Sequence, residues 1–541
     1  MEIILCISIR KLIVCTVLLN SLHILAPQGA VGFGTDTHER INVSAAQNST
    51  LDSFLSIDLA AKNVVFDRDF VLQLQEFVQG DKTGLDASVD GKRVVDWIGI
   101  GGRSEDQFLE DIVGQTLGEI AGGVTRSPRH FHTPLRDPWD QAGLNLLGIQ
   151  VQSSVHWAQN PNQSPGKKAS WKDARDAYYS ALTGRTKAKR EGAWADTFQI
   201  LGQLMHLVGD LGSTAHTRND SHLLGDGFET FMADPLNRPL IAGFQGIDPS
   251  VLHQPTADPF ATVPVARIWD TDTYNGTNPE VTTETTTNGA TIGLAEFTSA
   301  NFFSDDTITR QAFTDPVLPL PAIDRLSPGP VDFYPPTGNR RQYLSKLGEG
   351  VAPITHMVAE GIFSRFTPPF VRRHVLDDLV YQDYAQILLP RAIGYSAGLL
   401  NYFFRGRMEL MNPEHPFACC GAALADNTVV GEGVDGGIRN VTPGEETQGQ
   451  GRLVAVIPQR EGEEIIYHVS TPVAIDLTRE FQGDIAFDFA NDPIPFVANA
   501  SDRFCAFVGG TVPCDMHFVY RGPLGQEADA VMVLRSPVDF D

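Results

Sequence analysis

The chain has 541 residues, a length that allows two or more domains, each with its own hydrophobic core. Hydrophobic residues make up 42% of it and charged residues 20%, a balance that is typical of globular proteins and excludes an intrinsically disordered chain. The formal net charge of −25 at pH 7 makes the surface acidic, and an acidic surface repels a phosphate backbone. We therefore expect no extended nucleic-acid binding, whereas a single phosphate ester is compatible with this charge if divalent cations bind beside it.

The first 32 residues differ from the rest of the chain. The basic pair Arg10 and Lys11 precedes an apolar run that ends at Ala26, and small residues follow up to Gly32. This order is typical of a secretory signal peptide. A membrane anchor is the alternative, but the run is shorter than the roughly 20 residues that a membrane span needs. We expect residues 1–32 to be removed from a protein that is secreted or otherwise exported, to the periplasm or the extracellular space.

Helical signals follow. Ser170 with Asp173 three positions later predicts a capping box, after which apolar residues recur at helical spacing. A second helix is expected from about Ala193 to Leu211. A third is expected near 377–404, where Pro390 should kink or split it because proline lacks a backbone N–H.

Two later regions have other patterns. Residues 240–350 are rich in Pro, Thr, Asp and Gly, which predicts a long irregular insertion of the kind that forms lids and rims. From about residue 411, short β-branched or aromatic runs alternate with turn residues and predict an antiparallel sandwich-like domain. These runs are Leu453–Ile457, Ile465–Val469, Ile485–Phe489, Phe504–Val508 and Ala530–Leu534. The predicted fold class is therefore mainly α, with a helical domain over residues 33–410 and a β-sandwich-like domain over 411–541.

Four cysteines lie outside the signal segment. Cys505 and Cys514 flank a Gly-Gly turn, so a disulfide between them would close a hairpin in an oxidising compartment. Cys419 and Cys420 are adjacent, and the sequence leaves open whether they pair with each other or stay reduced. None of the four has zinc-finger spacing.

The stretch from 201 to 222 carries the strongest signal for a metal site. His206 and Asp210 are four residues apart and therefore lie on one face of the helix, where an imidazole and a carboxylate can bind one cation. Gly202 and Gly209 lie on the same face and leave room for a metal or for close backbone approach. His216 follows the helix end. A buried histidine hydrogen-bonded to the aspartate is the alternative, but further segments with histidines and acids favour the metal site.

The spacing of His206, Asp210 and His216 resembles that of the zinc-dependent bacterial phospholipases C and the fungal zinc single-strand nucleases. The upstream Arg-His-Phe-His-Thr-Pro segment resembles a second motif of that family, His-Phe-x-x-Pro. This resemblance implies that His130 is a further ligand, with His132 as the alternative. It also implies a helical metal-binding domain that holds two to three zinc ions.

The resemblance extends to the start of the expected mature chain. In the nuclease branch, the mature chain begins with an aromatic residue whose amine and carbonyl bind metal, and a ligand histidine follows five places later. Phe33 and His38 have this spacing, although the family usually has Trp at the first position. The resemblance therefore implies that Phe33 and His38 are both metal ligands.

Two acidic positions follow the family pattern less closely. The resemblance implies an acidic ligand or base ahead of His130, and we choose Asp106 over its neighbour Glu105, although the interval is longer than usual. The family's last His-x-x-x-acid pair is missing in its usual form. We choose Glu229 for it, and the further candidates are His222, Asp220 and Asp226.

The resemblance implies zinc-dependent hydrolysis of phosphate esters, phospholipase C-like, by a metal-activated hydroxide. Asp210 would bridge two cations, and Asp106 would orient or deprotonate the water. The two cations would be held by His38, Asp106, His130, His206 and Asp210, and a third by His216, His222 and Glu229. The implied substrate is a phospholipid or another phosphate ester, with peripheral membrane contact through the C-terminal domain. A single-strand nuclease or nucleotidase, and a non-catalytic exported zinc-binding surface protein, are the alternatives.

Overall fold

The structure is a computed structural model. It describes residues 34–59, 78–79, 82–105, 126–146, 149–163, 169–220, 226–237, 264–277, 292–308, 318–347, 353–361, 374–411, 423–425, 428–434, 437–461, 464–477, 483, 485–495, 504–507, 510–513 and 517–535. The predicted signal segment, Phe33, Asp106, His222 and Cys514 lie outside these ranges. No helix in the described part of the chain is both long enough and apolar enough to cross a membrane.

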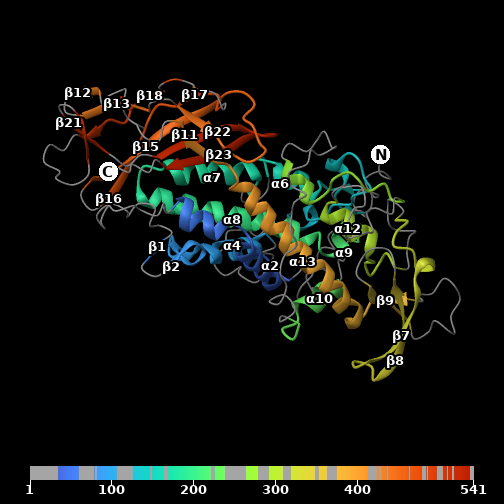
Figure 1. Ribbon diagram of the computed structural model, residues 1–541. Coiled ribbons are helices and arrows are strands. Elements are labelled where there is room, and N and C mark those ends of the chain that lie inside the picture. The colour runs from blue at the N-terminus through green and yellow to red at the C-terminus, as the bar shows by residue number, and fades with distance from the viewer. Residues whose placement is uncertain are drawn as a thin grey trace, which may run out of the picture.

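Five helices build the body of the molecule, and α8 lies between the others (Figure 1). They are α2 (Thr35–Asn48), α4 (Val94–Ser104), α7 (Trp171–Thr183), α8 (Lys187–Asp210) and α13 (Asp378–Phe403). The shorter helices are α3 (Leu51–Ser53), α6 (Ser154–Gln159), α9 (Thr214–Thr217), α10 (Gly227–Ala233) and α12 (Leu294–Asn301). The remaining helical turns are Phe54–Leu59, Gly84–Asp86, Ser127–Arg129, Trp139–Gln141, Pro264–Ile268 and Ile323–Arg325.

The long helices show where the sequence signals worked and where they did not. The capping box predicted at Ser170 and Asp173 is present at the start of α7. Helix α8 begins at Lys187 rather than near Ala193. Its first turns were not predicted from the sequence, because they are mostly charged and lack the apolar spacing of the later turns. Helix α13 runs through Pro390 without a break, so the prediction of a split is wrong. Most of this helix is buried, and that burial outweighs the loss of one backbone hydrogen bond.

Glycines let α4 cross α8 at very short distance. A Cβ on Gly202 would lie 2.2 Å from the carbonyl oxygen of Ile98, and one on Gly101 would lie 2.2 Å from that of Gln199. Asn42 of α2 donates a hydrogen bond to the Gly202 carbonyl oxygen at 2.8 Å, which ties the third helix to this crossing. Gly202 therefore serves close backbone approach, one of its two predicted roles.

The fold class predicted from the sequence, mainly α, is wrong, because the described residues form several antiparallel sheets as well as the helices. Sheets also occur outside the C-terminal region. A four-stranded antiparallel sheet in the order β10-β9-β8-β7 is built from β7 (Ser327–Tyr334), β8 (Asn339–Lys346), β9 (Ile354–Glu360) and β10 (His374–Val375). Strand β7 contains two prolines and a glycine and β8 is largely polar, so neither has the apolar alternation by which strands are recognised. Three small hairpins pair β1 (Val78–Gln79) with β2 (Lys82–Thr83), β3 (Ser88–Val89) with β4 (Lys92–Arg93), and β5 (Asn145–Leu146) with β6 (Ile149–Gln150).

The C-terminal strands form two main antiparallel sheets. One has the order β16-β15-β22-β23 with β17 beside β15, and the other has the order β12-β13-β18 with β19 beside β13. Further pairs are β11 with β14 and β20 with β21. The strands are β11 (Met408–Leu410), β12 (Ala423–Ala425), β13 (Thr428–Val434), β14 (Ile438–Asn440), β15 (Gly451–Glu461), β16 (Glu464–Val469), β17 (Val473–Ile475), β18 (Ile485–Asp488), β19 (Ile494–Pro495), β20 (Phe504–Phe507), β21 (Gly510–Pro513), β22 (His517–Leu524) and β23 (Glu527–Arg535).

The burial of strand β15 explains why the C-terminal strands could be predicted from the sequence. Leu453 and Ala455 pack into a cluster shared with residues of β18, such as Phe487, whereas Val454 and Val456 pack into the core of the helices. A strand buried on both faces has a continuous apolar run rather than an alternating one. Each predicted run coincides with a strand: β15, β16, β18, β20 or β23. Figure 1 shows these sheets lying along α7 at one end of the molecule.

Candidate metal centre

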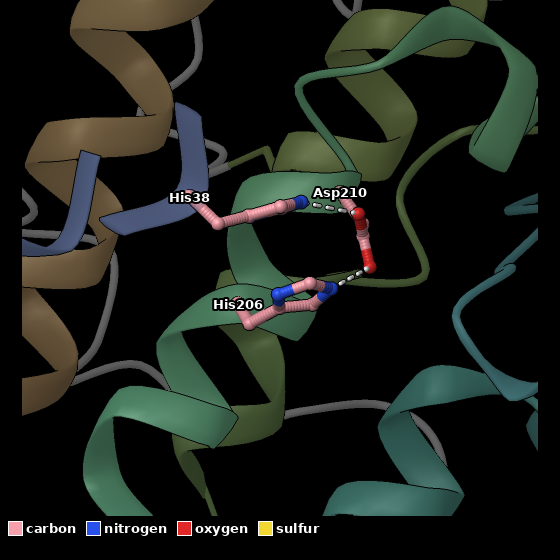
Figure 2. A group of neighbouring side chains, drawn as sticks. All are labelled: His38, His206 and Asp210. Atoms are coloured by element: carbon pink, nitrogen blue, oxygen red, sulfur yellow. Dashed lines mark ion pairs between the residues drawn. The ribbon is translucent and has the colours of Figure 1, made fainter. Parts of the chain in front are cut away.

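Figure 2 shows His38, His206 and Asp210 turned toward one another. His38 comes from the first turn of α2, and the other two come from consecutive turns at the end of α8. His38 Nε2 lies 3.1 Å from Asp210 Oδ1, and His206 Nε2 lies 3.3 Å from Asp210 Oδ2. One ligand atom from each residue lies within 4.8 Å of the others, and all three side chains are fully buried. A group of this composition and spacing can hold a divalent cation.

A third imidazole contacts the same carboxylate. His130 Nδ1 lies 3.0 Å from Asp210 Oδ2, and its ring centroid lies 4.9 Å from that of His206. The ring of His38 stacks on His206 at 3.5 Å. Burial raises the pKa of Asp210, but the surrounding histidines, His206 foremost, hold it well below its ordinary value. The carboxylate is therefore ionised, which is the form that binds a metal.

Outer contacts orient the rings of His206 and His130 toward Asp210. His206 Nδ1 lies 2.6 Å from the Gly102 carbonyl oxygen and donates to it, so Nε2 faces the carboxylate. His130 Nε2 lies 3.7 Å from Glu105 Oε1, so Nδ1 faces the carboxylate. A partner on the far nitrogen is what orients histidines that bind metals.

Glu105, the neighbour of the preferred Asp106, lies beside His130. Asp106 itself lies outside the described residues. Burial raises the pKa of Glu105, but the charge of Arg126 and the contact with His130 hold it below its ordinary value. Its oxygens accept hydrogen bonds from Arg126 at 2.6 Å and from Gln203 at 3.0 Å. Glu105 therefore contacts the site through His130, and no sequence pattern indicated its pairing with Arg126, 21 residues away.

His216 and Glu229 form a neighbouring group. His216 Nε2 lies 3.1 Å from Glu229 Oε1, which also accepts a hydrogen bond from Ser213 at 2.9 Å. The ring centroids of His216 and His130 lie 6.4 Å apart. His222, predicted for the same cation, lies outside the described residues. The structure thus brings two of the three residues chosen for the third cation next to the first group.

Two of the further candidates for the third cation, Asp226 and Asp220, accept hydrogen bonds from backbone N–H groups. Asp226 caps α10 by accepting a hydrogen bond from the Glu229 backbone N–H at 2.9 Å, and Asp220 accepts one from the backbone of Asp306, also at 2.9 Å. His132, the alternative to His130, lies with Nε2 2.8 Å from Asp270 Oδ2, and both side chains are fully buried. Asp270 comes from the predicted insertion, and no sequence pattern identified it.

Gly209 leaves room for His38, since a Cβ there would lie 3.2 Å from His38 Nδ1. We expect Gly209→Ala to displace this imidazole and to lower zinc affinity by about tenfold to a hundredfold, the usual effect of a change that disturbs ligand orientation. Isothermal titration calorimetry checks the affinity. Gly192→Ala is the matched control, because it lies on the same helix and has nothing within 4 Å of its Cβ. Equal zinc affinity of the two variants would contradict the prediction.

Comparisons of the chain with protein-family models, with curated proteins and with solved structures found no match.

Proposed function

We propose that this protein is a zinc-dependent phosphoesterase. The observation that carries the proposal is the position of Asp210, an ionised and fully buried carboxylate contacted by the imidazoles of His38, His130 and His206. Imidazole and carboxylate donors in this number suit zinc. The spacing shared with the zinc phospholipases C and zinc nucleases supports a phosphate ester as the substrate.

Each residue has a defined task in this proposal. His38 and His206 would hold a cation through Nε2, His130 would hold it through Nδ1, and the Asp210 carboxylate would complete the donor set. His216 and Glu229 provide the donors for an adjacent cation. Zinc at such a site lowers the pKa of a coordinated water to about 7 and polarises the phosphoryl oxygen. The residues of the chain fix the positions at which this chemistry takes place.

A phospholipid is the favoured substrate, because a net charge of −25 repels an extended nucleic acid. A nuclease is the second candidate. Hydrolysis of phosphatidylcholine, of bis(4-nitrophenyl) phosphate and of single-stranded DNA distinguishes them, and we expect activity on the first two. Activity on DNA alone would contradict the choice of lipid.

Removal of metal tests the proposal itself. We expect dialysis against a chelator to reduce hydrolysis of bis(4-nitrophenyl) phosphate to the background rate, and added zinc to restore it, because in this proposal the attacking hydroxide comes from a metal-bound water. Hydrolysis that is unchanged after the metal has been removed would contradict a metal-dependent mechanism. Bound zinc without hydrolysis of any of the three substrates would support the non-catalytic alternative instead.

A further inference from the structure

The most exposed large apolar side chains of the described residues lie toward one end of the molecule. Val331 on β7 is 49% exposed and Phe333 is 56% exposed. Leu347, just after β8, is 54% exposed, and Leu236, just after α10, is 85% exposed. Figure 1 shows α10 and the β7–β8 hairpin away from the C-terminal sheets, at the other end of the molecule. The exposed apolar surface is therefore not on the described part of the predicted β-domain.

The hairpin combines apolar and cationic side chains. Phe333 pairs with Arg340 across the two strands, and both are exposed. Arg341 is engaged differently, because it donates to Asp377 at 2.9 Å and its guanidinium lies 4.1 Å from the centre of the Tyr334 ring. From Phe333 to Arg341 the chain carries no carboxylate, in contrast to its overall charge of −25.

The outer edge of β7 is protected against strand addition. This strand is the last in its sheet, and it contains Pro328 and Pro330. Proline has no N–H to donate, so Pro328 and Pro330 interrupt a backbone ladder along the first half of this edge. The side chains of Val331 and Phe333 project from the face of the sheet, so a surface that covers them needs no backbone ladder. A fluid apolar phase meets this condition.

We propose that the β7–β8 hairpin, residues 327–346, inserts the side chains of Val331 and Phe333 into the surface of a zwitterionic phospholipid bilayer. Aromatic side chains are favoured at the boundary between headgroups and acyl chains, where Arg340 reaches the lipid phosphates. An anionic bilayer is disfavoured because it repels a chain of charge −25. The inference rests on the proposed function in one respect, since such a surface presents phosphodiesters to the metal centre.

Flotation of the full chain with phosphatidylcholine vesicles tests the proposal. We expect the wild type to bind. The double variant Val331→Ser/Phe333→Ser should bind about tenfold to a hundredfold more weakly, because it no longer transfers two apolar side chains from water into the bilayer. Phe333→Leu is the matched control, and its binding stays close to that of the wild type. Phosphatidylserine added to the vesicles weakens binding.

Three results would overturn the proposal: no binding by the wild type, equal binding by the double variant, or a dimer that the double variant separates into monomers without any effect on vesicles. Thermal unfolding of the double variant checks that it is folded. Asp210→Asn binds vesicles like the wild type, and the hairpin variants hydrolyse soluble bis(4-nitrophenyl) phosphate normally. Failure of the phosphoesterase proposal is thus distinguishable from failure of the hairpin proposal.

Discussion

Replacing Asp210 with Asn is expected to abolish both metal binding and phosphodiester hydrolysis. The carboxylate contacts three histidines through its two oxygens, whereas an amide has one acceptor oxygen and no charge. Metal stabilisation of transition-state charge is worth several kcal/mol, so the rate should fall by about a thousandfold or more. Elemental analysis and the rate on bis(4-nitrophenyl) phosphate measure the two effects.

Asp196→Asn is the matched control for this variant. Asp196 lies on the same helix, nearly four turns before Asp210, and its side chain is exposed. We expect this variant to keep its zinc and its activity. An Asp210→Asn protein that retains full metal content and rate would show that the carboxylate has only a structural role.

The second large effect is expected on stability, from Glu527→Gln. Glu527 of β23 is buried and accepts hydrogen bonds from Arg175 of α7 at 2.8 Å and from Arg405 at 2.7 Å, so it joins the C-terminal sheet to the helices. The variant leaves the buried guanidinium of Arg175 without its anion, whereas Arg405 keeps its ion pair with Glu445 at 2.7 Å. Breaking a buried pair in this way costs about 3–5 kcal/mol, which we expect in the free energy of unfolding measured with urea.

The control for Glu527→Gln is Asp529→Asn on the same strand. Asp529 pairs with Arg521 at 2.5 Å, but its side chain is 43% exposed, and exposed pairs contribute about 0–1 kcal/mol. Equal losses in the two variants would contradict the importance of the buried pair.

The lowered pKa of Glu527 predicts that the free energy of unfolding depends on pH. Burial raises its pKa, but the charges of Arg175 and Arg405 lower it from 4.5 to about 2. A carboxyl group whose pKa is lowered in the folded state stabilises the fold fully above its unfolded pKa. The stabilisation from Glu527 should therefore be complete above about pH 4.5 and decrease as the pH falls toward 2. Urea unfolding across this range should show a weaker pH dependence in Glu527→Gln, and an unchanged dependence would contradict the assignment.

Local spacing predicted only the part of the centre that one helix provides. His206 and Asp210 share a helix face, and four residues of spacing are enough to place them together. The positions of His38 and His130 depend on how α2 and the 130–132 segment pack, and only resemblance to a family suggested these residues. The place of Glu105 beside His130 depends on its burial and on its pairing with Arg126, which its position in the sequence does not reveal.

The secondary structure, like the metal centre, was predicted only where the local sequence pattern decides it. The C-terminal strands were predictable because both faces of a strand such as β15 are buried and its residues are uniformly apolar. The sheet that contains β7 was missed because Pro328 and Pro330 are typical of loops, although proline is tolerated at a sheet edge. The start of α8 was missed because it is charged. Each miss occurs where packing against distant residues, rather than the local pattern, decides the structure.

X-ray absorption at the zinc edge, on protein purified without chelator, tests the central claim most directly. We predict bound zinc with a first shell of nitrogen and oxygen at about 2.0–2.2 Å, including imidazoles, and no sulfur at about 2.3 Å. A protein without zinc that takes up none when it is supplied, or a shell that contains sulfur, would contradict a centre built on His38, His130, His206 and Asp210.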